Sequence, residues 1–439
     1  PDPFVGDNEK RVKWVAESDW EYTLTFIPDS ELLEQAKIFL VCDGLDTIAQ
    51  VTLNDYILGN TNDMFIQYEW DVKNILIDGE NIIKILFHSP TLNAAKLMAS
   101  RPLPEVTQAI PGGNYIRKAP CQFGWDWGPQ LPPIGIWKDI RLEGYNTAKI
   151  REILINQVHN RKHVNLKFSA EITQFDSHPM KIKFQIISPE GNILIEDFSS
   201  VNTNTVKKSF EITNPQLWYP NGYGKQPLYK IIISLHDENH IEDSKEYSIG
   251  LRTVELVQEK DEWGKSFRFT VNGIPIFAKG ANWIPADSFP TRITRNSLEE
   301  LIRSAASTHQ NMLRVWGGGF YESDLFYELC DQYGILIWQD MIFSCAVYPL
   351  NDHAFLEILK EEIKQNVRRL RHHACLTLWC GNNEMEWGWE GWGWQKPELK
   401  DMQNAYDAFF HNLLPDWVNE VDKNHPYWPS SPSSNTPFN

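Results

Sequence analysis

A change of hydrophobic pattern near residue 259 constrains the fold of this chain more than any other sequence feature. Before it, short runs alternate apolar and polar residues and are separated by turn residues, which is typical of antiparallel strands. After it, apolar runs alternate with amphipathic segments, which is typical of a parallel sheet whose strands are joined by helices. The chain is therefore expected to combine all-β domains with an α/β domain.

The all-β part divides into two stretches of strand-like runs. The first extends from Trp20 to about Gly144, and the second from about Asn146 to Val257. We expect a jelly-roll β-sandwich, of the kind that binds sugars, at residues 1–145 and an immunoglobulin-like β-sandwich at 146–258. The opening letters PDPFVGDNEK are typical of the middle of a domain, so the first sandwich is expected to be truncated at its N-terminus.

In the α/β part, strand-like and helix-like segments alternate. Strands are expected at residues 274–283, 311–319, 334–340, 376–384 and 426–432, and helices at 297–309, 323–333, 354–372 and 398–421. Ser297 and Glu300 predict a capping box at the first helix, and Gly334 predicts the end of the second. Pro415 is expected to kink or divide the last helix.

These strands are too few to close a barrel. A (β/α)8 barrel takes roughly 250 residues, whereas residues 260 to 439 number 180. We therefore expect residues 259–439 to form the N-terminal half of a (β/α)8 TIM barrel, with strands 1 to about 5. An unclosed sheet would expose a strand edge, so the chain is predicted to be a fragment of a longer protein.

Composition excludes several classes of function. Asp and Glu total 58 against 41 Lys and Arg, a net charge of -17, which argues against binding to nucleic acid. No run approaches the ~18 apolar residues of a membrane span. The six cysteines lack the spacing of a metal site and are expected to be core thiols. Tryptophan is frequent, with 18 copies, and its ring suits both large cores and the faces of sugars.

Polar and aromatic residues follow four successive strands of the predicted barrel. The loops at these strand ends build the active site of such a barrel. Packing at the barrel mouth is the alternative explanation for some of these side chains. The residues concerned are Asn282, Trp283, Trp316, Asp340, Asn383 and Glu384.

Glu384 is the leading candidate for catalysis. It follows a buried apolar strand and two amides, and a carboxyl at such a rim suits general acid catalysis. Asn383 is placed to donate to a substrate hydroxyl. The alternative is that Glu384 caps the next helix while the asparagines form a turn.

Four motifs carry a resemblance to a known family. The string LWCGNNE, ending at Glu384, resembles the acid/base motif of glycoside hydrolase family 2. The strings FGWDWGP (123–129), KGANWIPADSF (279–289) and LRVWGGGFYESDLFYELCDQYGILIWQD (313–340) resemble its β-mannosidase branch. The resemblance covers essentially the whole chain, and the motifs and domains follow the order of that family.

The resemblance implies a role for each matching residue. Glu384 corresponds to the general acid/base, Asn383 to the asparagine that binds the sugar 2-hydroxyl, and Trp316 to an active-site tryptophan. Asp126 corresponds to an aspartate that reaches from the first domain into the barrel mouth and binds the terminal sugar. A pocket closed in this way holds one sugar, so the enzyme is expected to be exo-acting.

Four other positions are given weaker roles. Trp392 resembles a residue that lines the sugar subsites, although several of the neighbouring tryptophans must be structural. Asn282 and Trp283 are candidates by their place at a strand end. For Asp340, direct binding and orientation of other pocket groups remain alternatives.

One expected catalytic residue is absent from the chain. The family's nucleophilic glutamate lies on strand seven, which falls beyond Asn439. A retaining mechanism needs two carboxyls about 5 to 5.5 Å apart, so this chain alone is expected to be inactive. The resemblance implies neither metal nor organic cofactor, and it implies a β-mannoside oligosaccharide as the partner.

Other functions stay open at this point. Another exo-β-glycosidase of the family, namely a β-galactosidase, β-glucuronidase or exo-β-glucosaminidase, is one alternative. A non-catalytic carbohydrate-binding protein is the other. No N-glycosylation sequon is present, which favours a periplasmic or secreted bacterial protein over a lysosomal one.

Overall fold

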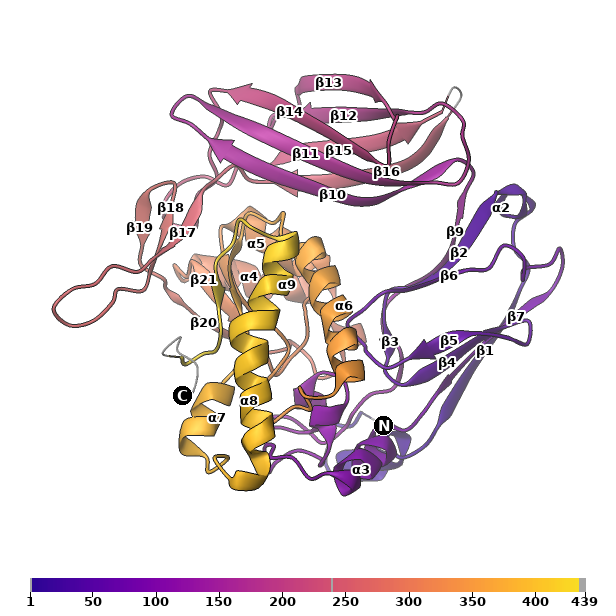
Figure 1. Cartoon of the computed structure of the whole chain (residues 1–439), viewed down its shortest axis with the longest axis vertical. Coiled ribbons are helices and arrows are strands. Elements are labelled where there is room, and N and C mark those ends of the chain that lie inside the picture. The colour runs from indigo at the N-terminus through magenta and orange to yellow at the C-terminus, as the bar shows by residue number, and fades with distance from the viewer. Residues whose placement is uncertain (1, 238–239, 434–439) are drawn as a thin grey trace.

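The computed structural model describes residues 2–237 and 240–433 and contains an α/β region flanked by two β-sandwiches (Figure 1). The first sandwich carries the sheets β1-β7-β4-β5 and β6-β2-β9 and the short pair β3-β8. Its strands are β1 (Trp20–Phe26), β2 (Lys37–Cys42), β3 (Leu45–Asp46), β4 (Ala49–Leu53), β5 (Tyr56–Thr61), β6 (Tyr68–Asp71), β7 (Asn81–Phe87), β8 (Gly135–Ile136) and β9 (Ile140–Tyr145). Three helices accompany them, α1 (Asn8–Val12), α2 (Ser30–Glu34) and α3 (Pro90–Ser100).

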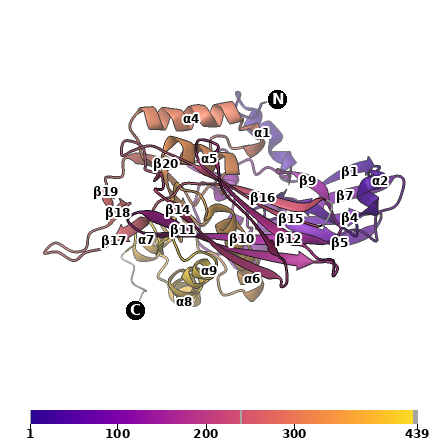
Figure 2. The same cartoon turned by 90° about the horizontal axis from the view of Figure 1, so that it is seen from above.

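The second sandwich pairs the sheet β10-β11-β14 with the sheet β13-β12-β15-β16. Its strands alternate buried and exposed residues, as the sequence predicts, and the inward side chains form a core of their own. Seen from above, it lies across the α/β region (Figure 2). Its strands are β10 (Ala148–His159), β11 (His163–Gln174), β12 (Lys181–Ile187), β13 (Ile193–Ser200), β14 (Thr205–Thr213), β15 (Tyr229–His236) and β16 (Ile241–Ile249).

A small antiparallel sheet joins the second sandwich to the α/β region. It consists of β17 (Val254–Val257), β18 (Arg268–Val271) and β19 (Ile274–Ile276), and β17 pairs with β18. The sheet spans residue 258, so the polypeptide is continuous in structure across the expected boundary. The division at this residue stays a prediction.

The α/β region is a parallel sheet in the order β20-β21-β22-β23-β24, which is also the order along the chain. Helices connect successive strands and cover the sheet (Figure 1). The strands are β20 (Gly280–Trp283), β21 (Met312–Val315), β22 (Leu336–Asp340), β23 (Leu376–Cys380) and β24 (Tyr427–Trp428). The helices are α4 (Arg295–Ser307), α5 (Asp324–Tyr333), α6 (His353–Leu370), α7 (Met385–Gly391), α8 (Lys400–Ala408) and α9 (Leu414–Val421).

The helix ends confirm one predicted signal and correct another. Gly334 ends α5 in the left-handed conformation, with φ of 73°. The predicted capping box at Ser297 and Glu300 is wrong, because Thr294 caps α4 and Ser297 returns the bond to the Thr294 backbone. Before Pro415, the chain passes through a π-helical turn (Phe409–Leu413), which accommodates a residue without a backbone N–H.

The first sandwich is joined to the α/β region by a shared core and a buried ion pair. Met64, Phe65 and Cys121 belong to the same apolar cluster as side chains of the parallel sheet and its helices. Arg117 binds Glu362 of α6 through two bonds of 2.6 and 2.7 Å, and both side chains are buried. The segment between α3 and β8 is thereby held against the carboxyl ends of the parallel strands.

Two expectations from composition concern the whole chain. All six cysteines are buried and unbridged, which confirms their interpretation as core thiols. Within the described residues, no helix is long and apolar enough to cross a membrane.

Candidate active site

Four parallel strands bring polar side chains together around Arg314. Its guanidinium donates to Asn282 Oδ1 (3.2 Å), to both oxygens of Asp340 (3.2 and 2.7 Å) and to Asn383 Oδ1 (2.9 Å). Three of these four residues come from β20, β21 and β22, and Asn383 lies in the segment that follows β23. Three of the predicted site residues thus meet at one cation, which the sequence analysis did not identify.

Asp340 holds this cation in place. Its carboxylate is fully buried, and it also accepts from Gly317 N and from Trp338 Nε1, each at 3.0 Å. Burial raises the pKa of Asp340, while Arg314 opposes the change. Burial alone would lower the pKa of Arg314, but the Asp340 carboxylate raises it, so the guanidinium stays charged. Both oxygens of Asp340 are engaged by protein donors.

Glu384 lies directly after Asn383 and has an unusual backbone conformation. Its φ of 59° is left-handed, which is uncommon for a residue other than glycine and concentrates at functional sites. It occupies the N-cap position of α7, yet its side chain makes no capping bond. Asn382 Oδ1 instead accepts from Met385 N (3.1 Å). The Glu384 carboxylate, which is half-buried, is therefore not used to cap the helix.

Cys345 is a second residue at the site that the sequence analysis did not single out. Its thiol donates to Glu384 Oε2 and accepts from Asn383 Nδ2, both at 3.2 Å. No sequence signal separates it from the other core cysteines. Arg314 did carry a signal, since it is a lone charge inside the apolar run of β21.

The loop that carries Asp126 packs over this site. Trp125 and Trp127 contact the buried Trp316 edge-on, with ring centroids 4.8 and 5.8 Å away. Cys121 N also donates to Gly318 O (2.8 Å), and only glycine fits there because a Cβ would lie 2.0 Å from the Trp316 ring. Asp126, between the two tryptophans, is exposed. The first domain thus contributes an exposed carboxylate beside Trp316.

Two predicted residues have other contacts. The indole N–H of Trp283 donates to Glu322 Oε1 (2.9 Å), and its ring packs on Phe326. Trp392 is 38% exposed and lies against Trp387, with ring centroids 5.6 Å apart. Among the described residues, neither side chain is hydrogen-bonded to Arg314 or to its partners Asn282, Asp340 and Asn383, which together form the Arg314 cluster.

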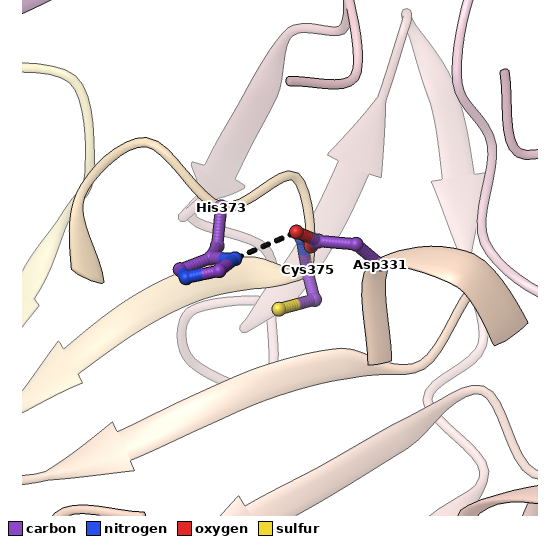
Figure 3. Close-up of side chains that lie close together, drawn as sticks. All are labelled: Asp331, His373 and Cys375. Carbon is purple, nitrogen blue, oxygen red and sulfur yellow. Dashed lines mark hydrogen bonds and ion pairs between the residues drawn. The ribbon is translucent and has the colours of Figure 1, made fainter. Parts of the chain in front are cut away.

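One buried group has the ligand types of a metal site. Asp331, His373 and Cys375 place one donor atom each within 4.8 Å of one another (Figure 3). Asp331 already bonds His373 Nδ1 (2.7 Å) and Cys375 N (2.7 Å), and burial raises the pKa of the Cys375 thiol, which disfavours the thiolate that a metal needs. The bonds join the end of α5 to the start of β23, which is a structural role.

Asp237, His240 and Glu242 form a second, more exposed group of metal-ligand types. Both ring nitrogens of His240 face carboxylates, Asp237 Oδ2 at 3.1 Å and Glu242 Oε1 at 2.6 Å. The imidazole therefore acts as the partner of the two acids.

Two family models match the chain. The model described as glycosyl hydrolase 2 galactose-binding domain-like matches residues 1–138, and that described as glycosyl hydrolases family 2 matches residues 148–252. Together they cover the two β-sandwiches apart from residues 139–147, which include β9.

Curated relatives extend the similarity to the α/β region. The β-mannosidase of Capra hircus is 36% identical over 99% of this chain and 51% of its own length. β-Mannosidase B of Emericella nidulans is 37% identical over 98% of this chain and 52% of its own length. The chain spans about half the length of the curated relatives it matches.

Solved structures agree with these relatives. The β-D-mannosidase of Dictyoglomus thermophilum is 38% identical, with a TM-score of 0.92 over 98% of this chain and 53% of that one. An exo-chitosanase of Amycolatopsis orientalis shares the fold at 17% identity, with a TM-score of 0.73 over 98% of this chain and 46% of that one. By its matching family models and its similarity to β-mannosidases along nearly its entire length, the chain belongs to glycoside hydrolase family 2.

Proposed function

We propose that this chain is the front half of an exo-acting, retaining β-mannosidase. Its reaction is the removal of terminal β-D-mannose from the non-reducing ends of oligosaccharides or glycoconjugates. One observation carries the proposal: Arg314 binds Asn383, the residue before Glu384, in the segment that follows β23, and a first-domain loop packs on the neighbouring site residue Trp316. The similarity to β-mannosidases over nearly the whole chain supports it.

Glu384 has the role of general acid and base in this proposal. In the first step its carboxyl gives a proton to the glycosidic oxygen while the sugar C1 leaves that oxygen and bonds to a nucleophilic carboxylate. In the second step the Glu384 carboxylate takes a proton from water, the water oxygen bonds to C1, and the nucleophile leaves. Net retention results from the two displacements.

Asn383 and Asp126 recognise the sugar. The amide of Asn383 binds the 2-hydroxyl, which is axial in mannose, and Arg314 fixes the orientation of that amide. Asp126 accepts hydrogen bonds from hydroxyls of the terminal sugar, at the strength typical of a carboxylate acceptor. The pocket is completed by Trp316 and by the supporting residues Asn282 and Asp340. Trp283 and Trp392 lie around this pocket and pack against its neighbours. One sugar fits beneath the loop, so cleavage proceeds from the chain end.

The architecture completes the proposal. Residues 1–145 form the jelly-roll domain, 146–258 the immunoglobulin-like domain, and 259–439 the first five strands of a (β/α)8 barrel. Five parallel strands in chain order, joined by helices, support this interpretation. The nucleophile then belongs to a later strand of the complete protein.

The test uses the complete protein and a panel of p-nitrophenyl β-glycosides. We expect hydrolysis of the mannoside in preference to the galactoside, glucuronide and glucosaminide, with β-mannose as the first product in NMR spectra. The Glu384→Ala variant should lose a factor of roughly 10² to 10⁴ in rate on this substrate. Added azide should restore part of it, because the azide anion attacks C1 of the glycosyl-enzyme without needing a base and gives β-mannosyl azide as the nucleophilic carboxylate leaves. The Asp126→Ala variant should raise KM.

Two outcomes would contradict the proposal. Preference for another glycoside would place the protein in a different branch of the family. Binding of mannose without hydrolysis would favour a non-catalytic carbohydrate-binding protein.

A further inference from the structure

Cys345 differs from the other five cysteines in its partners. Its thiol lies 3.2 Å from Oε2 of Glu384 and 3.2 Å from Nδ2 of Asn383, the two residues to which the proposed function gives the chemistry. The side chain is 3% exposed, so these contacts form away from bulk water. In the described part of the chain, Glu384 Oε1 has no hydrogen-bond partner.

The backbone fixes the thiol opposite Glu384. Beyond the ends of β22 and β23, Asn383 N donates to Phe343 O (2.9 Å) and Cys345 N donates to Asn383 O (3.1 Å). Glu384 N donates in turn to Ser431 O (3.1 Å). The segments that carry the two side chains are therefore paired by main-chain bonds, and neither position depends on side-chain packing alone.

Cys345 and Glu384, at the ends of these paired segments, both have a left-handed backbone conformation. The φ angle is 47° at Cys345 and 59° at Glu384. A residue with a Cβ is disfavoured there, so two such residues in contact indicate a geometry that the surroundings enforce. The effect is to direct the thiol and the carboxylate toward each other.

The hydrogen bonds continue from the thiol to the Arg314 cluster. Arg314 donates to Asn383 Oδ1, Asn383 Nδ2 donates to Cys345 Sγ, and Cys345 Sγ donates to Glu384 Oε2. The direction of donation is fixed at the first step, because a guanidinium has no acceptor. Burial raises the pKa of Cys345 to about 12, so the sulfur keeps its proton and acts as the donor to Glu384.

We propose that Cys345 is a positioning residue that holds Oε2 of Glu384 and thereby turns Oε1 toward the glycosidic oxygen. The inference rests on the proposed function and adds to it the residue that orients the general acid. A thiol suits this task because it is a weak donor. It fixes the rotamer without strongly favouring the ionised carboxylate, which must be protonated when the first step begins.

Other ionisable groups face the same site. Arg314 and Asp340 act on Glu384 through Asn383, Cys380 lies beside Arg314, and the hydroxyl of Tyr348 accepts from Ser344 N next to the thiol. None of them is altered in the variants chosen here, so their influence is constant across the comparison.

The experiment compares two leaving groups in the complete protein. Hydrolysis of phenyl β-mannoside requires protonation of the leaving phenol oxygen. The leaving group of 2,4-dinitrophenyl β-mannoside is a weak base and departs as the anion without protonation. For Cys345→Ala, we expect kcat/KM to fall roughly tenfold or more on the phenyl substrate and less than about threefold on the dinitrophenyl substrate. Cys345→Ser restores a donor and should recover most of the phenyl activity. Its stronger hydrogen bond favours the ionised acid, so the alkaline limb of the pH profile should move to lower pH.

Matched variants separate positioning from folding. Cys330→Ala removes another buried thiol, from α5, and should leave kcat/KM unchanged on both substrates. The melting temperatures of Cys345→Ala and Cys345→Ser, measured beside the wild type, show whether a loss of activity is a loss of folding.

The outcomes distinguish the inference from the function on which it rests. Equal losses of Cys345→Ala on both substrates, or no loss on either, would overturn the positioning role while the β-mannosidase assignment stands. A wild-type protein that hydrolyses neither mannoside would overturn both.

Discussion

Arg314 connects three residues of the site, and Asp340 is the partner that keeps its charge there. Asn282 and Asn383 offer only neutral oxygens, so without Asp340 the guanidinium would face the strand ends with no counter-charge. Removing one partner of a largely buried ion pair is strongly destabilising, whereas a neutral acceptor of the same shape preserves part of the geometry.

The Asp340→Ala variant should therefore lose both stability and activity. We expect a loss of about 3 to 5 kcal/mol in stability, because the Arg314 charge stays partly buried without its partner. Asp340→Asn should lose less stability, and its kcat should still fall because Asn383 is less firmly held. Thermal unfolding and kcat on p-nitrophenyl β-mannoside measure the two effects. Wild-type kcat in Asp340→Asn would show that Arg314 orients nothing that matters to the reaction.

Glu322, which binds the indole of Trp283, makes the stability of the fold depend on pH. Burial raises its pKa to about 7, from 4.5 in an exposed position. The folded state then binds a proton more tightly than the unfolded state, so this group favours folding fully below pH 4.5 and progressively less up to about pH 7. Glu322→Gln keeps an acceptor for Trp283 and removes the titration.

The Glu322→Gln variant is therefore expected to be more stable than the wild type at pH 8, and the gain should shrink as the pH falls toward 5. The melting temperatures of both proteins across this range measure it. A constant difference at every pH would show that Glu322 is ionised throughout.

At the scale of elements, α6 is the helix that holds the first sandwich in place. Its Glu362 binds Arg117, while Asp63 lies beside the pair with its own carboxyl buried. Burial first, and the neighbouring Glu362 second, raise the pKa of Asp63 well above its usual range. One arginine thus faces two carboxyls, and the raised pKa of Asp63 favours its protonated form.

This arrangement predicts unequal effects of two substitutions. Arg117→Ala leaves the Glu362 charge buried, so we expect a loss of about 3 to 5 kcal/mol and faster proteolysis between the first sandwich and the α/β region. Asp63→Asn replaces a neutral acid by a neutral amide and should change stability by less than about 1 kcal/mol. Urea unfolding of both variants tests the difference, and equal losses would mean that Asp63 is ionised.

The elements also show what sequence patterns can predict. Local sequence signals predict the ends of β20, β21, β22 and β23 and the end of α5 at Gly334. The four strand ends carry most of the candidate residues. The strands β13 and β14 are largely exposed, so their apolar alternation is weak and local patterns mark them poorly. The start of α4 was misplaced because Thr294 and Ser297 both suit an N-cap, and only the tertiary path selects Thr294.

For the candidate site, the sequence pattern predicted which residues lie at strand ends but not which hydrogen bonds they make. Asn282, Asp340 and Asn383 were identified by their places at strand ends, yet their common partner lies inside β21, where a lone arginine in an apolar run marks a position but does not name its partners. Cys345 became distinguishable only when the segment after β22 paired with the segment after β23. Such contacts join residues 26 to 69 positions apart, and no local pattern encodes them.

At the scale of the whole molecule, the parallel sheet has two edges. β20 pairs only with β21 among the described strands, and β24 only with β23, whereas a closed barrel has no edges. Residues 280–282 of β20 are exposed, and so is the nearby Phe277, at 76%. Unpaired strand edges with exposed aromatic neighbours favour association with other chains.

The chain produced alone is therefore expected to associate and to hydrolyse no β-mannoside, since the described sheet is open and the proposed function places the second carboxyl on a later strand of the complete protein. Mixing it with the separately produced C-terminal part of the complete protein should bury both edges and restore turnover, because strand pairing then brings the nucleophile opposite Glu384. Size-exclusion chromatography and p-nitrophenyl β-mannoside hydrolysis measure both effects. The same mixture with Glu384→Ala should stay inactive, which excludes a contaminating enzyme. A monodisperse chain that hydrolyses the mannoside alone would mean that a carboxyl within residues 1–439 serves as nucleophile.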